Sequence, residues 1–160
     1  MGVGYVAGVP GFTPRDASAA LALVTAATEE RYEVLGFCRT LRPLAISPRQ
    51  RLDDAVKAVS GLPFGGTDCA QPMLYAQARR LEIDTFVIYT DSETWAGAVH
   101  PAQALRDYRR KSGIDARLVV VGMVSNGFSI ADPADPEMLD VVGFDTATPQ
   151  LISDFARGAL

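Results

Sequence analysis

The stretch Thr85–Asp91 limits the possible folds of this chain more than any other. It is a short run of β-branched and aromatic residues that ends abruptly in a carboxylate. This length and composition are typical of a buried parallel strand. Because ligands of open α/β sheets bind just beyond the carboxyl ends of the strands, Asp91 stands where a functional carboxylate is expected. The alternative is that Asp91 only closes a turn or caps the next element.

The composition restricts the class of protein. A chain of 160 residues with 48% hydrophobic and 21% charged residues suits one globular domain. No apolar run approaches the roughly 20 residues of a membrane span, and no secretory signal is recognisable. Cys38 and Cys69 match no metal-binding spacing, so we expect reduced thiols and a cytoplasmic protein. The net charge of −4 argues against strong polyanion binding by this chain alone.

Helical and strand patterns alternate along the chain. Apolar spacing, prolines and glycines predict helices at Pro14–Glu30, from Pro48 up to Gly61, and at Cys69–Leu81, Pro101–Lys111 and Pro149–Arg157. Short apolar runs predict strands at Tyr32–Cys38, Leu41–Ile46, Phe86–Tyr89, Arg117–Met123 and Leu139–Phe144. This alternation indicates an α/β fold with a doubly wound, mostly parallel sheet, in one domain over residues 1–160.

Two of the helix starts carry specific signals. Ser47-Pro48 places a proline at the first helical position. Asp68 followed by Gln71 fits a capping box. We therefore expect helices to begin directly at these residues.

Loops at the carboxyl edge of the sheet supply candidate ligands for a metal ion. The turn Gly65–Asp68 leads into a helix whose amino end points at this edge, and Asp91 ends the neighbouring strand. The hydroxyl of Thr67 and the carboxylate of Asp91 are hard oxygen donors of the kind that Mg²⁺ accepts. The competing interpretation is that Thr67 and Asp68 serve only to cap a helix.

Other chemistry has weaker support in the sequence. His100 is the only histidine and directly precedes Pro101, so capping or packing is favoured over catalysis. No metal cluster with histidine and no nucleophilic triad can be assembled. A basic run near one helix end fits a solvated face favoured by the helix dipole better than a phosphate site. Its members are Arg106, Arg109, Arg110 and Lys111.

Four motifs of the chain together resemble the Ro ribonucleoprotein family, which is marked by the TROVE module. They are Gly-Gly-Thr-Asp-Cys at 65–69, Tyr-Thr-Asp-Ser-Glu-Thr at 89–94, His-Pro-Ala at 100–102 and the segment Val124–Pro133. The similarity extends through Gly143-Phe144-Asp145 to the end, so it covers most of the chain. It matches the family's C-terminal domain, which is similar to a von Willebrand factor A domain.

The resemblance implies a metal-ion-dependent adhesion site (MIDAS) at the carboxyl edge. Thr67 matches the threonine of its second loop and Asp91 the aspartate of its third, so Mg²⁺ or another divalent cation is expected to bind weakly. The main motif of the site, Asp-x-Ser-x-Ser, is absent from this sequence. By the resemblance, the chain begins just after that motif and lacks the central first strand between Tyr32–Cys38 and Phe86–Asp91. We expect such a domain to be unstable, to associate, or to place Val3–Val9 in the gap.

The resemblance also implies a function. The chain is expected to be a non-catalytic domain of a Ro-type RNA-binding protein in non-coding RNA quality control. Y-like and misfolded RNAs would bind through the full-length protein, a protein partner could bind at the metal site, and neither DNA nor a membrane is expected as a partner. One alternative is a metal-dependent protein-adhesion module that does not bind RNA. Another is a small hydrolase that uses Asp91 and His100.

Overall fold

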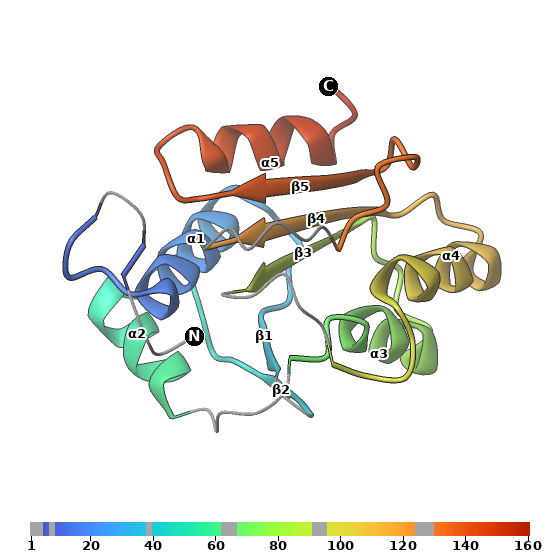
Figure 1. Cartoon of the computed structure of the whole chain (residues 1–160). Coiled ribbons are helices and arrows are strands. Elements are labelled where there is room, and N and C mark those ends of the chain that lie inside the picture. The colour runs from blue at the N-terminus through green and yellow to red at the C-terminus, as the bar shows by residue number, and fades with distance from the viewer. Residues whose placement is uncertain (1–4, 7–8, 38–39, 62–66, 91–95, 124–129) are drawn as a thin grey trace.

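The computed structural model describes residues 5–6, 9–37, 40–61, 67–90, 96–123 and 130–160. Its helices are α1 (Pro14–Thr28), α2 (Leu52–Ser60), α3 (Gln71–Arg79), α4 (Pro101–Ser112) and α5 (Thr148–Ala156). Its strands are β1 (Leu35–Phe37), β2 (Leu41–Pro43), β3 (Thr85–Thr90), β4 (Arg117–Gly122) and β5 (Met138–Val142). Figure 1 shows β3, β4 and β5 as one sheet with helices on either side. Within the described ranges, no helix is long and apolar enough to cross a membrane.

The sheet β3-β4-β5 is parallel throughout, with β4 in the middle. Thr85 pairs with Arg117 at the amino end of β3, and Thr90 pairs with Gly122 at its carboxyl end. The expected doubly wound parallel sheet is therefore confirmed. Asp91 follows β3 directly in the sequence and lies outside the described residues.

Successive residues of the strands point into two different cores. Phe86, Ile88, Leu118 and Val120 pack with α3 and α4 on one face of the sheet. Val87, Tyr89, Val119 and Val121 pack with α1 and α5 on the other face. Because side chains alternate along a strand, a sheet covered on both faces needs apolar residues at every position. This explains the continuous apolar runs of β3 and β4.

The strands β1 and β2 form a separate antiparallel pair, with Leu35 opposite Pro43. Figure 1 shows this pair beyond β3, on the side of the parallel sheet away from β5. Both strands are shorter than predicted from the sequence, and no pairing joins them to β3 within the described residues. An exposed Pro43 fits the predicted edge position, since proline has no backbone donor.

The first residues contribute to the core without forming a described strand. Val6 is 2% exposed and packs against α1 and β4. Its N–H donates to the carbonyl of Phe12 at 2.9 Å. The prediction that Val3–Val9 enters the sheet falls partly outside the described residues, and Val6 and Val9 are not in a strand.

The start of α2 corrects the sequence-based prediction. The helix begins at Leu52, whereas residues 48–50 form a turn after Ser47. The Gln50 side chain accepts from the Ser47 N–H at 2.9 Å and donates to the Ala45 carbonyl at 2.9 Å. These two bonds satisfy backbone groups in the turn conformation, so Pro48 opens a turn instead of the helix.

The predicted capping box of α3 is also wrong. Ala70 is the N-cap of α3 and makes no side-chain capping bond. The Asp68 carboxylate instead accepts from the Ala70 N–H at 3.1 Å. The backbone carbonyl of Asp68 accepts from the Gln71 N–H at 3.2 Å. This local turn holds the Asp68 side chain at the start of α3.

Tyr108 joins α4 to the connection between α3 and β3. Its hydroxyl donates to the Leu81 carbonyl at 2.7 Å and accepts from the Ile83 N–H at 2.8 Å. Its ring meets Phe86 edge-on at a centroid distance of 5.1 Å. Tyr108 is 1% exposed, and its buried hydroxyl both donates and accepts a hydrogen bond. These contacts fix α4 against the sheet.

Candidate functional site

The carboxyl ends of β3 and β4 meet at the edge of the sheet where a metal site was predicted. The Met123 N–H donates to the Thr90 carbonyl at 2.9 Å, which keeps the two strands together past their last pair. Thr90 is fully buried. Asp91 and the loop after Met123 lie outside the described residues, so their predicted place at this edge stays a prediction.

The turn that carries Thr67 contacts the segment that leads from β3 to α4. The Ala96 N–H donates to the Thr67 carbonyl at 2.7 Å. Beside it, Gly97 lies so close to Asp68 that a Cβ placed on it would be 2.6 Å from Oδ1 and 2.9 Å from Oδ2. Thr67 and Asp68 are therefore in contact with Ala96 and Gly97, although the two pairs lie far apart in the sequence. Ala96 and Gly97 were not predicted from the sequence, where their only signal is a glycine within a loop.

The described residues supply few ligands for the predicted cation site. Thr67 offers one neutral oxygen, and its half-buried turn is held by backbone contacts. Asp91 would add one carboxylate from the connection on which Ala96 lies. Among the described residues, no group of three or more histidine, cysteine or acidic side chains could hold a metal ion. A hard cation bound by these two predicted donors would keep most of its water ligands.

His100 is the N-cap of α4. Its Nδ1 accepts from the Ala102 N–H at 3.2 Å, and Pro101 occupies the first turn. The opposite end of the helix stops at Gly113, which has a φ of +74°. The capping bond confirms the predicted capping role of His100, and the end of α4 at Gly113 confirms the predicted helix stop.

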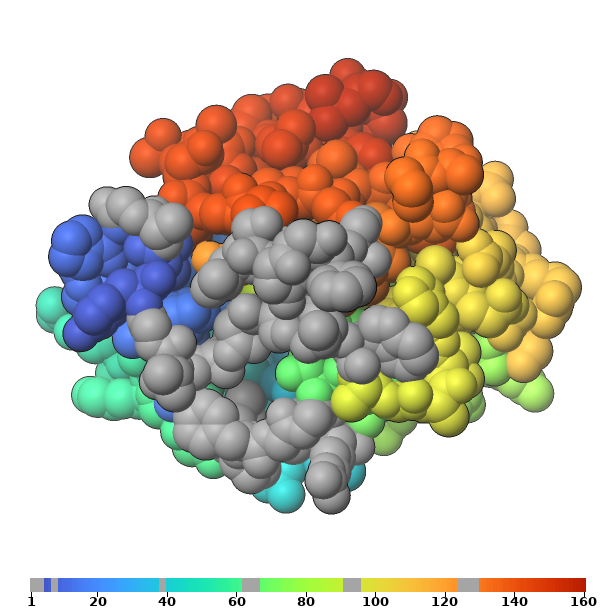
Figure 2. Space-filling model, viewed as in Figure 1, coloured from blue at the N-terminus to red at the C-terminus, as the bar shows by residue number. Residues whose placement is uncertain are grey.

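The arginines of the predicted basic run pair with carboxylates. Arg106 binds Asp132 with an N–O distance of 3.1 Å, and Arg110 binds Asp107 at 2.8 Å. Figure 2 shows the segment that contains Asp132, in orange, next to α4, in yellow. These pairs balance the charges of Arg106 and Arg110, whereas Lys111 of the same run is exposed.

Arg109 is held more deeply than the other two arginines. Its guanidinium binds Asp135 at 2.6 Å and donates to the Ala116 carbonyl at 2.8 Å, with 17% of the side chain exposed. Burial alone would raise the pKa of Asp135. The hydrogen bonds from Arg109 and the Glu137 N–H, together with the charges of Arg109 and Arg106, instead lower the pKa below its ordinary value.

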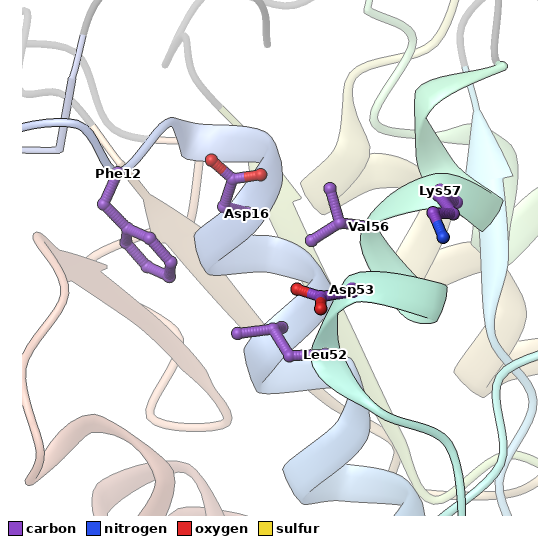
Figure 3. A pocket seen from close by; sticks show the side chains of 6 residues that line it. All are labelled: Phe12, Asp16, Leu52, Asp53, Val56 and Lys57. Atoms are coloured by element: carbon purple, nitrogen blue, oxygen red, sulfur yellow. The ribbon is translucent and has the colours of Figure 1, made fainter.

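A second surface feature is a hollow of about 470 Å³ between the start of α1 and α2 (Figure 3). Its lining combines apolar and charged side chains: Phe12, Asp16, Leu52, Asp53, Val56 and Lys57. Asp16 is already engaged in a capping box, since it accepts from the Thr13 N–H at 2.9 Å while Thr13 caps α1. The lining thus holds two carboxylates, of Asp16 and Asp53, and one ammonium group, of Lys57.

Comparison with known proteins identifies the family. The family model described as "Ro60 vWA domain" matches residues 3–156. This chain belongs to the Ro60 vWA-domain family. The resemblance expected from the motifs is therefore confirmed, and the described fold agrees with it.

Two curated relatives carry the name RNA-binding protein RO60. The protein of Deinococcus radiodurans is 52% identical over 99% of this chain, and that of Caenorhabditis elegans is 40% identical over 91%. The matched region is 30% of the first relative and 23% of the second. This chain thus corresponds to less than a third of the length of these proteins.

One solved structure agrees with this assignment, and a second shares the fold. The crystal structure of the Deinococcus radiodurans RO (RSR) protein matches all of this chain and 32% of its own, with a TM-score of 0.92 and 52% identity. Proximal thread matrix protein 1 from the mussel byssus matches 89% of this chain and 42% of its own, with a TM-score of 0.54. At 15% identity, the second likeness concerns the fold alone.

Proposed function

We propose that this chain is a non-catalytic domain of a Ro-type RNA-binding protein in non-coding RNA quality control. In this proposal, Y-like and misfolded RNAs bind mainly through other parts of a longer protein. The first statement is supported by the relatives that are named RNA-binding proteins. This chain matches less than a third of their length. The pairing of Arg106, Arg109 and Arg110 with carboxylates supports the second. Nucleic-acid affinity depends largely on cations that are free to release counterions from phosphates.

We expect the 160-residue chain to bind single-stranded RNA only weakly. The expected dissociation constant is about 10⁻⁴ M or higher at physiological salt, at the weak limit of non-specific nucleic-acid binding. The measurement is a mobility-shift titration at fixed salt with an unstructured RNA. The double substitution Arg106→Glu and Arg110→Glu should change this affinity by less than about threefold, because neither cation carries much of it.

Arg42→Glu and Arg49→Glu provide a matched control, because they change exposed charges by the same amount away from α4. Sub-micromolar binding that is lost in the α4 variant but kept in the control would contradict the proposal. It would mean that this domain recognises RNA itself.

We further propose that Thr67 and Asp91 form a weak site for Mg²⁺ or another divalent cation. The contact between the Thr67 turn and Ala96 supports this proposal, because Asp91 lies five residues before Ala96 in the same connection. The cation would supply open coordination positions for a carboxylate of a protein partner. A second candidate function that would use the same proposed site is a metal-dependent protein-adhesion module that binds no RNA.

Calorimetric titration with Mn²⁺ tests this site. We expect weak binding, with a dissociation constant of about 10⁻⁴ to 10⁻³ M, because one carboxylate and one hydroxyl leave most positions to water. Asp91→Ala should abolish binding, and Thr67→Val, which removes only the hydroxyl, should weaken it. Asp115→Asn, at an exposed position before β4, should have no effect. Equal affinity in all four proteins would refute the assignment of these ligands.

A further inference from the structure

The hollow between α1 and α2 combines apolar side chains with carboxylates. Its volume of about 470 Å³ lies within the range of about 300–1,000 Å³ that is typical of ligand pockets. Phe12, Leu52 and Val56 supply the apolar part of the lining (Figure 3). Leu52 is 39% exposed. A molecule bound in the hollow would therefore remove apolar surface from water, which is favourable.

The apolar side chains of the hollow are held in place by contacts with the rest of the domain. The Phe12 ring packs against Phe144 with 5.4 Å between the ring centroids, and its carbonyl accepts from the Val6 N–H at 2.9 Å. Val56 packs against the buried cluster that α1 and α2 share, which includes Ala55. Because these side chains are ordered before any partner arrives, little free energy is lost in ordering them on binding.

Asp16 has one carboxylate oxygen outside its capping box. Both bonds from Thr13, one from its N–H at 2.9 Å and one from its hydroxyl at 2.7 Å, end on Oδ2. No hydrogen bond to Oδ1 is found among the residues that the structure describes. The neighbouring Arg15 donates to the Ser60 carbonyl at 3.5 Å instead. One oxygen of Asp16 is thus left to accept a hydrogen bond from a bound molecule.

The second carboxylate of the lining, Asp53, has an excess negative charge around it. The Lys57 Nζ lies 3.8 Å from Oδ1 of Asp54, so its charge is shared with a carboxylate outside the lining. Arg51 precedes α2 and does not line the hollow. Within the described ranges Asp53 forms no ion pair, and Figure 3 shows its carboxylate beside Leu52. The lining is therefore complementary to a cation that lies next to an apolar group.

We propose that the hollow binds a segment of a protein partner in which an arginine lies next to apolar side chains. An apolar side chain of that segment covers Leu52 and Val56, and the guanidinium pairs with the carboxylates of Asp16 and Asp53. Arginine fits this role because its planar donor group matches carboxylate oxygens and because it is enriched among the dominant residues of protein interfaces. No proposed cation ligand lines the hollow, so this proposal stands independently of that site.

The test is an NMR titration of the isotope-labelled 160-residue chain with the tripeptide Leu-Arg-Leu, blocked at both ends. We expect the amides of the lining residues to shift, with a dissociation constant of about 10⁻³ M, because so short a peptide buries little surface. The blocked tripeptides Leu-Glu-Leu and Ser-Arg-Ser remove the cation and the apolar groups in turn. Each should bind about fivefold more weakly or worse.

Two variants test the residues of the hollow with the same Leu-Arg-Leu probe. Leu52→Ser should weaken binding by about fivefold and Asp53→Asn by about threefold. Leu74→Ser on α3 is the matched control for the first, since Leu74 is 37% exposed and lies outside the hollow. Asp115→Asn, at another exposed carboxylate, is the control for the second. Circular dichroism verifies that each variant is folded, and Asp53→Asn carries the test if Leu52→Ser is not.

Three results would overturn the proposal. They are shifts confined to residues outside the hollow, equal binding of Leu-Arg-Leu and Leu-Glu-Leu, and equal losses in a folded variant of the hollow and its control. Shifts at the hollow that grow with protein concentration in the absence of peptide would overturn it as well, because they would assign the hollow to a second copy of this chain.

Discussion

Leu118→Ala should lower the free energy of unfolding by about 2–5 kcal/mol. Leu118 lies in the central strand β4, is fully buried, and belongs to the core between the sheet and the helices α3 and α4. Its replacement removes apolar atoms from that core and leaves a cavity that parallel strands on both sides keep from closing. For a domain stable by about 5–15 kcal/mol, this is a large fraction of the total.

Urea denaturation followed by circular dichroism measures this effect. Leu160→Ala is the matched control, because the same atoms are removed from a side chain that is 71% exposed. We expect the control to change stability by less than about 0.5 kcal/mol. A loss of similar size in both variants would show that burial in the hydrophobic cores does not determine the stability of this domain.

Arg109→Ala should be the most damaging change among the charged residues of α4. It leaves the Asp135 carboxylate, which is 15% exposed, without its cation, and it leaves the Ala116 carbonyl without a donor. Breaking a buried ion pair costs about 3–5 kcal/mol, and the residual exposure of both side chains reduces our expectation to about 2–3 kcal/mol. Thermal and urea unfolding at neutral pH give the measurement.

The dependence of stability on pH gives a second readout of the same pair. The pKa of Asp135 is lower in the folded chain than its ordinary value of 3.8. Its ionised form therefore stabilises the fold fully above that ordinary value, and the contribution is lost as the pH falls through the lowered pKa. Arg109→Ala should flatten this acid-side loss, whereas the unsubstituted chain should show it.

Arg106→Ala is the control for Arg109→Ala. Arg106 also pairs with an aspartate across the same two segments, but 47% of its side chain is exposed. Exposed ion pairs contribute about 0–1 kcal/mol, so this variant should unfold nearly like the unsubstituted chain. Equal losses from the two substitutions would argue that burial does not distinguish the two pairs.

The order of the elements and the type of sheet could be predicted from the sequence, because both follow from periodicity. The alternating burial of β3 and the nearly complete burial of β4 correspond to their apolar runs. The first residues of helices were harder to predict where side chains form hydrogen bonds with nearby backbone groups. Gln50 stabilises a turn where Pro48 suggested a helix, and Asp68 bonds Ala70 instead of capping α3.

The candidate site was predictable only as a set of loops at one edge of the sheet. The sequence places Thr67 and Asp91 at segment ends, which predicts a shared edge but no distances. The close approach of Gly97 to Asp68 depends on tertiary packing between connections that no local pattern encodes. The pairing of Arg109 with Asp135 was missed for the same reason, since the two residues are 26 positions apart.

Because a hydrophobic core lies on each face of the sheet, the central strand β4 could pair in the wrong register during folding. Leu118 and Val120 face α3 and α4, while Val119 and Val121 face α1 and α5, so a shift of β4 by one residue would exchange aliphatic side chains for one another. Hydrophobicity alone therefore does not distinguish the native register of β4 from its neighbours. Arg117, which binds Glu137 at the start of the strand, and Gly122, paired with Val142 at its end, would both be misplaced by such a shift. We conclude that the correct register of the most hydrophobic strand depends on its two least hydrophobic positions.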